Sequence, residues 1–294
     1  MMNKKMIYSL LLLLGLGFLL VVTLYKPQDR EPKEGFTAHR LVAHAMGGID
    51  GLTYSNTYEA FEANYEKGLR VFEADLLLSK DGKLIARHEW GESFTVMMGQ
   101  ENVMDPGTHA AVWTYEEFKN AKIMGQYEPL GWEDILDLME EHPDMYLITD
   151  TKQIEPEEID QIFNIIVEST EMRDPELLKR IVPQIYYQSM WDDIQTKYHF
   201  ESVIFTLYQT HDSDESVVQF AKDKGIAAIT MSETRANADL VASLNELGIP
   251  SYVHTINDKD TVLKFKRMGV YGFYTDFLVE EDVHSSTWLH YIGL

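Results

Sequence analysis

Short apolar segments alternate with amphipathic segments along most of the chain. In four places an amphipathic segment ends at a glycine (68, 225, 248 or 269) and an apolar segment follows. Glycine suits the left-handed residue that ends a helix, and strands that alternate with helices pair in parallel through right-handed crossovers. Eight apolar segments can be strands, near residues 40–45, 71–78, 145–151, 181–187, 202–208, 226–232, 250–256 and 270–276. Eight such strands predict a (β/α)8 TIM barrel, and an open doubly wound sheet is the weaker alternative because it lacks a glycine-rich nucleotide loop.

The first predicted helix follows the first strand. Asn56 has the position of its N-cap, with an acidic residue three positions later, and Tyr58, Phe61 and Tyr65 would form its inner stripe. A second helix is predicted over 130–142.

The segment 89–130 breaks the alternation. It contains several methionines, a Pro-Gly turn at 106–107 and a short helix near 115–122. In a barrel, a long insertion after the second strand lies over the catalytic mouth. The sequence therefore predicts a barrel with a small insertion.

The N-terminus has a different character. Residues 6–25 form a run of 20 without a charged side chain. As a helix this run spans roughly 30 Å, the thickness of the hydrocarbon layer of a membrane. Lys4 and Lys5 precede it, as in a signal sequence, and no small-x-small pair or cysteine follows. A buried core helix is the alternative, but core helices are rarely apolar all round at this length.

We therefore expect a cytoplasmic tail at 1–5, a transmembrane signal anchor at 6–25, a linker at 26–37 and the barrel at 38–294. Lysines and arginines flank both ends of the apolar run, so their distribution does not set its orientation. A short tail before a large domain resembles a signal anchor that exports the domain behind it. This predicts a single-pass protein of the cell membrane with an extracellular catalytic domain.

Charge narrows the range of partners. The chain has 25 basic and 48 acidic residues, a net charge of −23. Nucleic acid is disfavoured as a partner, as is an anionic membrane surface bound by charge alone.

Two acidic side chains share one face of the second predicted strand. Glu73 and Asp75 are two positions apart, and alternate side chains of a strand point to the same face. The other positions of this strand are apolar, so it is expected to be buried on both faces and a solvent-exposed acidic face fits poorly. A divalent cation would relieve the repulsion and desolvation of the two carboxylates, and oxygen ligands favour Mg²⁺ or Ca²⁺.

Several sparse residues in this part of the chain match one family together. The residues are His44, Asn56-Thr57, Gly68, Glu73-x-Asp75, Asp81-Gly82 and His88. In order and spacing they resemble the glycerophosphodiester phosphodiesterases, which belong with the phosphatidylinositol-specific phospholipases C. The resemblance extends over about residues 40–280. It implies metal-dependent hydrolysis of a glycerol-based phosphodiester, with His44 and His88 as the acid–base pair in an order that the sequence leaves open.

The same resemblance implies further site residues. In these families the third strand supplies a metal ligand and a nearby lysine, which implies Asp150 as the third ligand and Lys152 as a phosphate contact. A simple ion pair between these two side chains is the alternative. The expected substrate contacts are Asn56, Trp90, Tyr208 and His254.

These substrate contacts have structural alternatives. Trp90 could equally pack within the insertion, and Tyr208 could cap a layer of the barrel. His254 stands where a tryptophan is common in the family. Asp276 resembles the family's closing Thr-Asp and is either a site residue or a helix cap.

Three positions depart from the family pattern. Ala45 stands where an arginine is common, which removes one phosphate contact. Ser55 replaces a glutamate and Glu89 replaces an aspartate. We expect the substrate to be a small or a lipid-derived phosphodiester. A phospholipase C- or D-like activity on a lipid and a non-catalytic surface-binding barrel remain as alternatives. A barrel glycosidase is disfavoured, because its acids must lie on opposite sides of a cleft.

Overall fold

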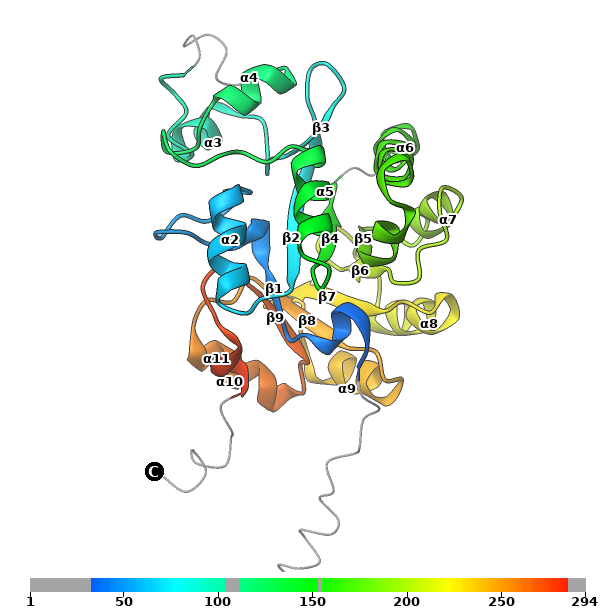
Figure 1. Ribbon diagram of the computed structural model, residues 1–294. Coiled ribbons are helices and arrows are strands. Elements are labelled where there is room, and N and C mark those ends of the chain that lie inside the picture. Colours follow the sequence, from blue (N-terminus) through cyan, green and yellow to red (C-terminus); the bar gives the residue numbers. More distant parts are fainter. Residues whose placement is uncertain (1–32, 104–110, 153–154, 285–294) are drawn as a thin grey trace, which may run out of the picture. The chain divides into compact units, whose positions relative to one another are not determined.

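The computed structural model describes residues 33–103, 111–152 and 155–284, and a compact unit begins at Gly35. In it, parallel strands close into a TIM barrel (Figure 1) in the order β1 (Leu41–Ala43), β2 (Val71–Leu78), β4 (Tyr146–Asp150), β5 (Ile181–Ile185), β6 (Ile204–Thr206), β7 (Ala228–Ser232), β8 (Ser251–His254) and β9 (Gly272–Thr275). The barrel closes because β1 pairs in parallel with both β2 and β9. These are the eight strands predicted from the sequence.

One strand was not predicted. Strand β3 (Leu84–Ala86) runs antiparallel to the end of β2, with Leu76 opposite Ala86. Strand β2 therefore continues beyond the barrel into a hairpin, and the backbone N–H of Arg87 donates to the carbonyl of Asp75 at 2.8 Å. Three residues carry too little pattern to identify a strand, yet this hairpin returns the chain to the barrel mouth just before His88.

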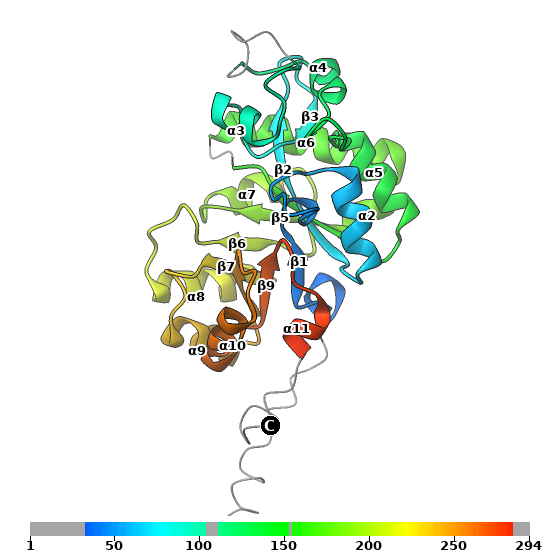
Figure 2. The same ribbon diagram turned by 90° about the vertical axis from the view of Figure 1, so that its left-hand side faces the viewer.

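The helices lie outside the strands (Figure 2). In chain order, the helices of the barrel are α2 (Tyr58–Glu66), α5 (Trp132–Glu141), α6 (Pro156–Arg173), α7 (Met190–Gln195), α8 (Asp214–Lys224), α9 (Ala238–Glu246), α10 (Lys259–Met268) and α11 (Glu280–His284). The insertion carries α3 (Glu92–Met97) and α4 (Tyr115–Asn120), and the 3-10 helices are η1 (Gly35–Ala38), η2 (His44–Met46) and η4 (Pro175–Arg180). As predicted, Gly225 and Gly269 end α8 and α10 in the left-handed conformation, with φ of 66° and 100°.

Two details of the predicted first helix are wrong. Thr57, not Asn56, is the N-cap of α2, since its hydroxyl accepts from the N–H of Ala60 at 3.3 Å. Tyr58 is 41% exposed and does not belong to the inner stripe, which consists of buried Phe61 and partly buried Tyr65. The helix begins one residue later than expected. The side chain of Asn56 is therefore not used as a cap and contacts Asp75 instead.

Side chains that point into the barrel form layers. The lower layers are apolar and fully buried, and they include Val42, Val71, Ile148, Val182, Ile204 and Ala228. Because side chains alternate along each strand, the inward position two residues further on lies one layer higher. Those positions hold His44, Glu73, Asp150, Gln184, Thr206 and Thr230. An apolar floor thus supports a polar layer at the carboxyl ends of the strands.

The opposite end of the barrel is closed by η1. The ring of Phe36, 1% exposed, stacks on Tyr252 with a centroid distance of 6.5 Å. The hydroxyl of Tyr252 donates to the carbonyl of His39 at 2.7 Å, and that of Tyr271 donates to the carbonyl of Thr37. Burying one such aromatic ring stabilises a fold by about 1.5–3 kcal/mol. The compact unit therefore starts three residues before the predicted boundary at 38.

The predicted signal anchor at 6–25 lies outside the described residues. Within 33–103, 111–152 and 155–284, no helix has the length and hydrophobicity needed to cross a membrane.

Candidate active site

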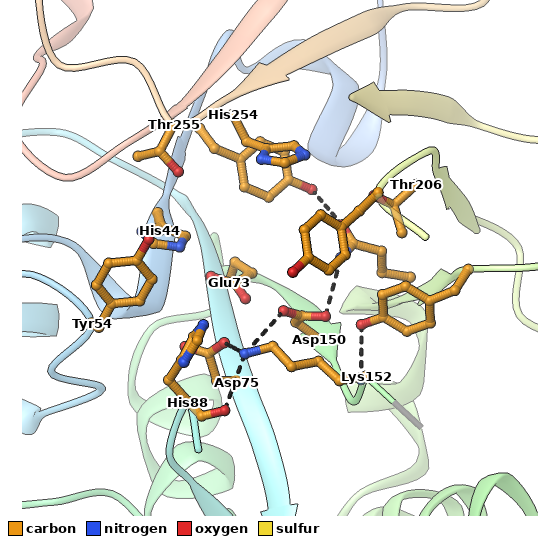
Figure 3. A pocket seen from close by; sticks show the side chains of 14 residues that line it. His44, Tyr54, Glu73, Asp75, His88, Asp150, Lys152, Thr206, His254 and Thr255 are labelled. Atoms are coloured by element: carbon orange, nitrogen blue, oxygen red, sulfur yellow. Dashed lines mark hydrogen bonds and ion pairs between the residues drawn. The ribbon is translucent and has the colours of Figure 1, made fainter. Parts of the chain in front are cut away.

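A pocket opens at the carboxyl ends of the barrel strands (Figure 3). The residues that line it are His44, Tyr54, Glu73, Asp75, His88, Asp150, Lys152, Gln184, Tyr186, Thr206, Tyr208, His254, Thr255 and Tyr274. Among them are eight of the ten predicted site residues; Asn56 and Trp90 are not. A TIM barrel carries its active site at this end in essentially every characterised enzyme.

Three carboxylates meet at the centre of this pocket. Glu73 and Asp75 share the inner face of β2, and the parallel register between β2 and β4 pairs Asp75 with Asp150. One oxygen of each side chain lies within 4.8 Å of the others. The shared strand face and the adjacent strand bring these acids together as expected.

The pKa values of these three acids are shifted by burial and by neighbouring charges. Burial and the charge of Asp75 hold the pKa of Glu73 well above its ordinary value. Burial raises the pKa of Asp150 to about 7, against the opposing effect of Lys152. Burial alone would also raise the pKa of Asp75, but the charges of Lys152 and His88 lower it. A set of three close carboxylate oxygens with little solvent suits a hard divalent cation, and these residues could hold Mg²⁺ or Ca²⁺.

Hydrogen bonds from neighbouring groups fix the carboxylates of Glu73 and Asp75. The N–H of Ala45 donates to Glu73 at 2.7 Å. The side-chain amide of Asn56 donates to Asp75 at 2.9 Å and accepts from the backbone N–H of the same residue at 3.2 Å. Asn56 is fully buried and is not among the residues that line this pocket, so its position suits a support for Asp75. Its direct contact with substrate stays a prediction.

Lys152 is the cation beside these acids. Its ammonium donates to Asp75 at 2.6 Å and to the carbonyl of His88 at 3.2 Å, and it lies 3.8 Å from Asp150. Although burial opposes the effect, the charge of Asp75 raises the pKa of Lys152. Its backbone is left-handed, with φ of 57°, and its N–H donates to the Tyr186 hydroxyl at 2.9 Å. A non-glycine residue in this conformation costs about 1–3 kcal/mol and is typical of functional sites.

His44 is held by a carboxylate from the opposite end of the chain. Its Nδ1 lies 2.9 Å from Asp276, whose other oxygen accepts from Asn257 at 2.7 Å. A carboxylate oxygen accepts a hydrogen bond from an N–H, so Nδ1 carries a hydrogen and Nε2 is left for the pocket. Burial would lower the pKa of His44, but the bond to Asp276 and the charge of Glu73 raise it to about 9. Asp276 therefore orients His44, and its carboxylate is not used as a helix cap.

His88 follows β3 and reaches the pocket from the insertion side. Its ring packs between Tyr54, at a centroid distance of 4.8 Å, and Phe94, at 5.7 Å. Burial lowers the pKa of His88. The two predicted catalytic histidines thus lie on the same pocket in opposite electrostatic surroundings.

The wall that faces β2 is formed by polar and aromatic groups. Tyr208 is 65% exposed, and its ring lies edge-on to His254 with a centroid distance of 6.3 Å. Burial lowers the pKa of His254 to about 4, so this imidazole is neutral near pH 7. Thr206 and Gln184 also line the pocket, and Gln184 donates to Asp150 at 3.3 Å. Tyr208 and His254 thus both line the pocket, and their contact with substrate stays a prediction.

Trp90 packs within the insertion. Its ring meets Trp113 at a centroid distance of 5.8 Å, and the Arg87 guanidinium lies 4.9 Å from it. This placement corresponds to the structural alternative for Trp90, and its contact with substrate stays a prediction.

Several pocket residues were missed from the sequence alone. Gln184, Thr206 and Tyr274 each lie two positions after an inward-facing residue of the same strand, so the alternation of the strands could have indicated them. Tyr54 lies in an irregular loop with φ of 58°, where no periodic signal exists.

The part of the chain that carries this pocket is similar to known proteins. The model of the glycerophosphoryl diester phosphodiesterase family matches residues 44–280, which include every residue that lines the pocket. A candidate glycerophosphodiester phosphodiesterase of Bacillus subtilis (strain 168), YhdW, is 23% identical over 267 residues, or 84% of this chain and 99% of YhdW.

Solved structures share the fold. A glycerophosphodiester phosphodiesterase from Parabacteroides distasonis ATCC 8503 has a TM-score of 0.66 at 19% identity, over 87% of this chain and 98% of that one. An Oleispira antarctica phosphodiesterase, solved in complex with the product sn-glycerol-3-phosphate, has a TM-score of 0.62 at 16% identity, over 84% of this chain and 96% of that one. At these identities the likeness concerns the fold.

The carboxylate cluster predicts that the chain needs a divalent metal. EDTA should abolish hydrolysis, and added Mg²⁺ or Ca²⁺ should restore it, because Glu73, Asp75 and Asp150 otherwise repel one another. Calorimetric titration of the metal-free protein should detect binding, and Glu73→Gln should weaken it by more than the roughly 10–100-fold typical of an outer-shell change. Glu66→Gln, the same change at an exposed position, is the control. Full activity in a metal-free sample would show that the metal assignment is wrong.

The bond between His44 and Asp276 generates a second prediction. Asp276→Asn keeps the shape of the side chain but removes the charge that orients and stabilises the protonated His44. We expect kcat to fall by about 10²-fold, the lower end of what one acid–base group contributes. Asp258→Asn, the same change on the neighbouring loop after β8, is the matched control, since Asp258 caps α10 and is not among the residues that line this pocket. Equal kcat in the two variants would exclude a role of Asp276 in the reaction.

Proposed function

The chain belongs to the glycerophosphoryl diester phosphodiesterase family and is a hydrolase of the glycerophosphodiester phosphodiesterase type, and we propose that it cleaves a glycerol-based phosphodiester into glycerol phosphate and an alcohol. One observation carries this proposal. His44 and His88 share a single pocket with Glu73, Asp75 and Asp150. The Oleispira antarctica phosphodiesterase of the same fold was solved with sn-glycerol-3-phosphate, which is such a product.

The reaction requires two proton transfers. An oxygen–phosphorus bond forms to water, or to a neighbouring substrate hydroxyl to give a cyclic phosphate that water then opens, and the bond from phosphorus to the departing alcohol oxygen breaks. One histidine removes the proton of the attacking hydroxyl, and the other donates a proton to the departing oxygen. His44 and His88 fill these two roles, each for a gain of about 10²–10⁴-fold. After direct hydrolysis a proton remains to be exchanged with solvent, which restores the pair.

The negative charge of the phosphodiester must also be compensated. A divalent cation held by the three carboxylates would supply Lewis-acid stabilisation of a phosphoryl oxygen. The ammonium of Lys152 lies beside the same carboxylates and can contact a second oxygen of the phosphate. The Nε2 atom of His44 is available for the substrate because its Nδ1 is engaged by Asp276.

The substrate can also be a lipid. In that case the same histidines would catalyse phospholipase C- or D-like cleavage, with loss of the head group at one or the other ester bond. Tyr208, which is 65% exposed at the rim of the pocket, leaves room on that side for either kind of substrate.

A panel of phosphodiesters observed by ³¹P NMR tests the proposal. We expect glycerophosphodiesters to give a glycerol phosphate resonance, and His44→Ala and His88→Ala to lower the rate by at least about 10²-fold. A cyclic phosphate released from a phospholipid, or conversion of phospholipid vesicles alone, would indicate the lipid-cleaving alternative. Absence of turnover for every diester in the presence of Mg²⁺ or Ca²⁺ would refute the proposal.

We also propose that residues 6–25 anchor the enzyme in the cell membrane, with the barrel outside the cytoplasm. The support is the sequence, a run of 20 residues without charge after Lys4 and Lys5. Protease added to intact spheroplasts should then digest the barrel, and a cytoplasmic protein of the same cells is the control. A barrel that is cleaved only after lysis would contradict this orientation.

A further inference from the structure

The two predicted catalytic histidines are held in different ways. His44 is fixed by a hydrogen bond to Asp276. The imidazole of His88 has no hydrogen-bond partner among residues 33–103, 111–152 and 155–284, and only its carbonyl is engaged, by Lys152. An imidazole attached to a loop needs other contacts to keep one orientation.

Two aromatic rings supply those contacts. The plane of His88 is 24° from that of Phe94, and it is 76° from that of Tyr54. The ring of Tyr54 also meets His44 edge-on, with a centroid distance of 4.6 Å and an angle of 84°. Tyr54 thus lies beside both histidines on the wall of the pocket (Figure 3). Stacked and edge-to-face arrangements of this kind are favourable by about 0.5–1.5 kcal/mol each beyond the area they bury.

Both rings are anchored in the insertion. Phe94 belongs to α3 and is buried in a cluster with Met98, Ile123 and Tyr127, and Tyr54 packs against the same cluster. The loop of Tyr54 is tied to it by a hydrogen bond from the Tyr127 hydroxyl to Asp50 at 2.6 Å. The insertion and the loop therefore form one support on the His88 side of the pocket.

Arg87, the residue before His88, fixes this support to the barrel. It is 2% exposed, and it donates to Gln100 at 2.8 Å, to Thr95 at 3.2 Å and to the carbonyl of Glu89 at 2.8 Å. Its guanidinium also lies 4.9–5.0 Å from the ring centroids of three aromatic side chains, Trp90, Phe94 and Trp113. A buried arginine with this many partners holds α3 and the base of His88 at a fixed separation.

We propose that Tyr54 and Phe94 are positioning residues, which hold the His88 imidazole in its catalytic orientation by ring packing. The insertion is then part of the catalytic machinery through α3. Ring packing leaves both nitrogens of His88 without a hydrogen bond among the described residues, so they stay available for proton transfer, which a hydrogen-bonded support would not allow. This inference rests on the proposed function, because it assumes that His88 takes part in the reaction.

Kinetics of the full-length protein with saturating Mg²⁺ and a glycerophosphodiester test the proposal. Tyr54→Leu and Phe94→Leu should each lower kcat by about tenfold or more with little change in KM, since a displaced catalytic group can cost up to ~10²-fold. Tyr54→Phe keeps the ring and should retain kcat. Phe265→Leu makes the same change at a fully buried position of α10, outside this support and the pocket, and it should leave kcat near that of the unchanged protein.

A spectroscopic measurement separates positioning from general loosening of the fold. The C–H resonances of the His88 imidazole, assigned with His88→Gln, should shift in Tyr54→Leu and Phe94→Leu and keep their positions in Phe265→Leu. Unchanged resonances and kcat in Tyr54→Leu and Phe94→Leu would overturn the inference, as would a loss of kcat in Phe265→Leu equal to theirs. Full activity of His88→Gln would instead overturn the proposed role of His88 itself, so the two failures are distinguishable.

Discussion

The burial of three carboxylates at one point is the constraint to which the rest of the site responds. Removing a charged group from water costs several kcal/mol per ion unless partners replace the solvent. Glu73 receives a backbone N–H, Asp75 receives an amide and an ammonium, and Asp150 receives Gln184. These partners come from the loop after β1, from the residues after β4 and from β5. Compensating the charge of the acids therefore also fixes the loops that carry the catalytic groups.

Most of the barrel could be predicted because its strands are buried on both faces. Mostly apolar runs such as 71–78, in which only Glu73 and Asp75 are polar, identify such strands, and glycines at the ends of helices mark where the next strand begins. The exact residue at which a helix begins could not be predicted. Thr57 rather than Asn56 caps α2, and this shift by one position exposes Tyr58. Strand β3 is too short to show a period, although the hairpin it forms decides where His88 lies.

The candidate site was predictable where its chemistry is local in sequence. Glu73 and Asp75 share a strand, so alternation alone places them together. Asp276 is 232 residues from His44, and only the closure of the barrel through the pairing of β1 with β9 makes them neighbours. An aspartate near a helix also serves as a cap, so the sequence left its role open. Contacts made across a closing barrel are the part of a site that sequence pattern conveys least.

The absence of an arginine at position 45 changes the charge balance of the pocket. Ala45 is fully buried with a left-handed backbone, and its N–H is engaged by Glu73, so no side chain reaches the pocket from this position. Lys152 is the only lysine or arginine among the described residues that line the pocket, and Asp75 already neutralises it at 2.6 Å. An anionic diester therefore meets an excess of negative charge unless further cations are present. A metal held by the carboxylates and a protonated His44, whose pKa is raised to about 9, would together make the net charge of the pocket positive. Binding of the metal and binding of the substrate are thus coupled through the same three carboxylates.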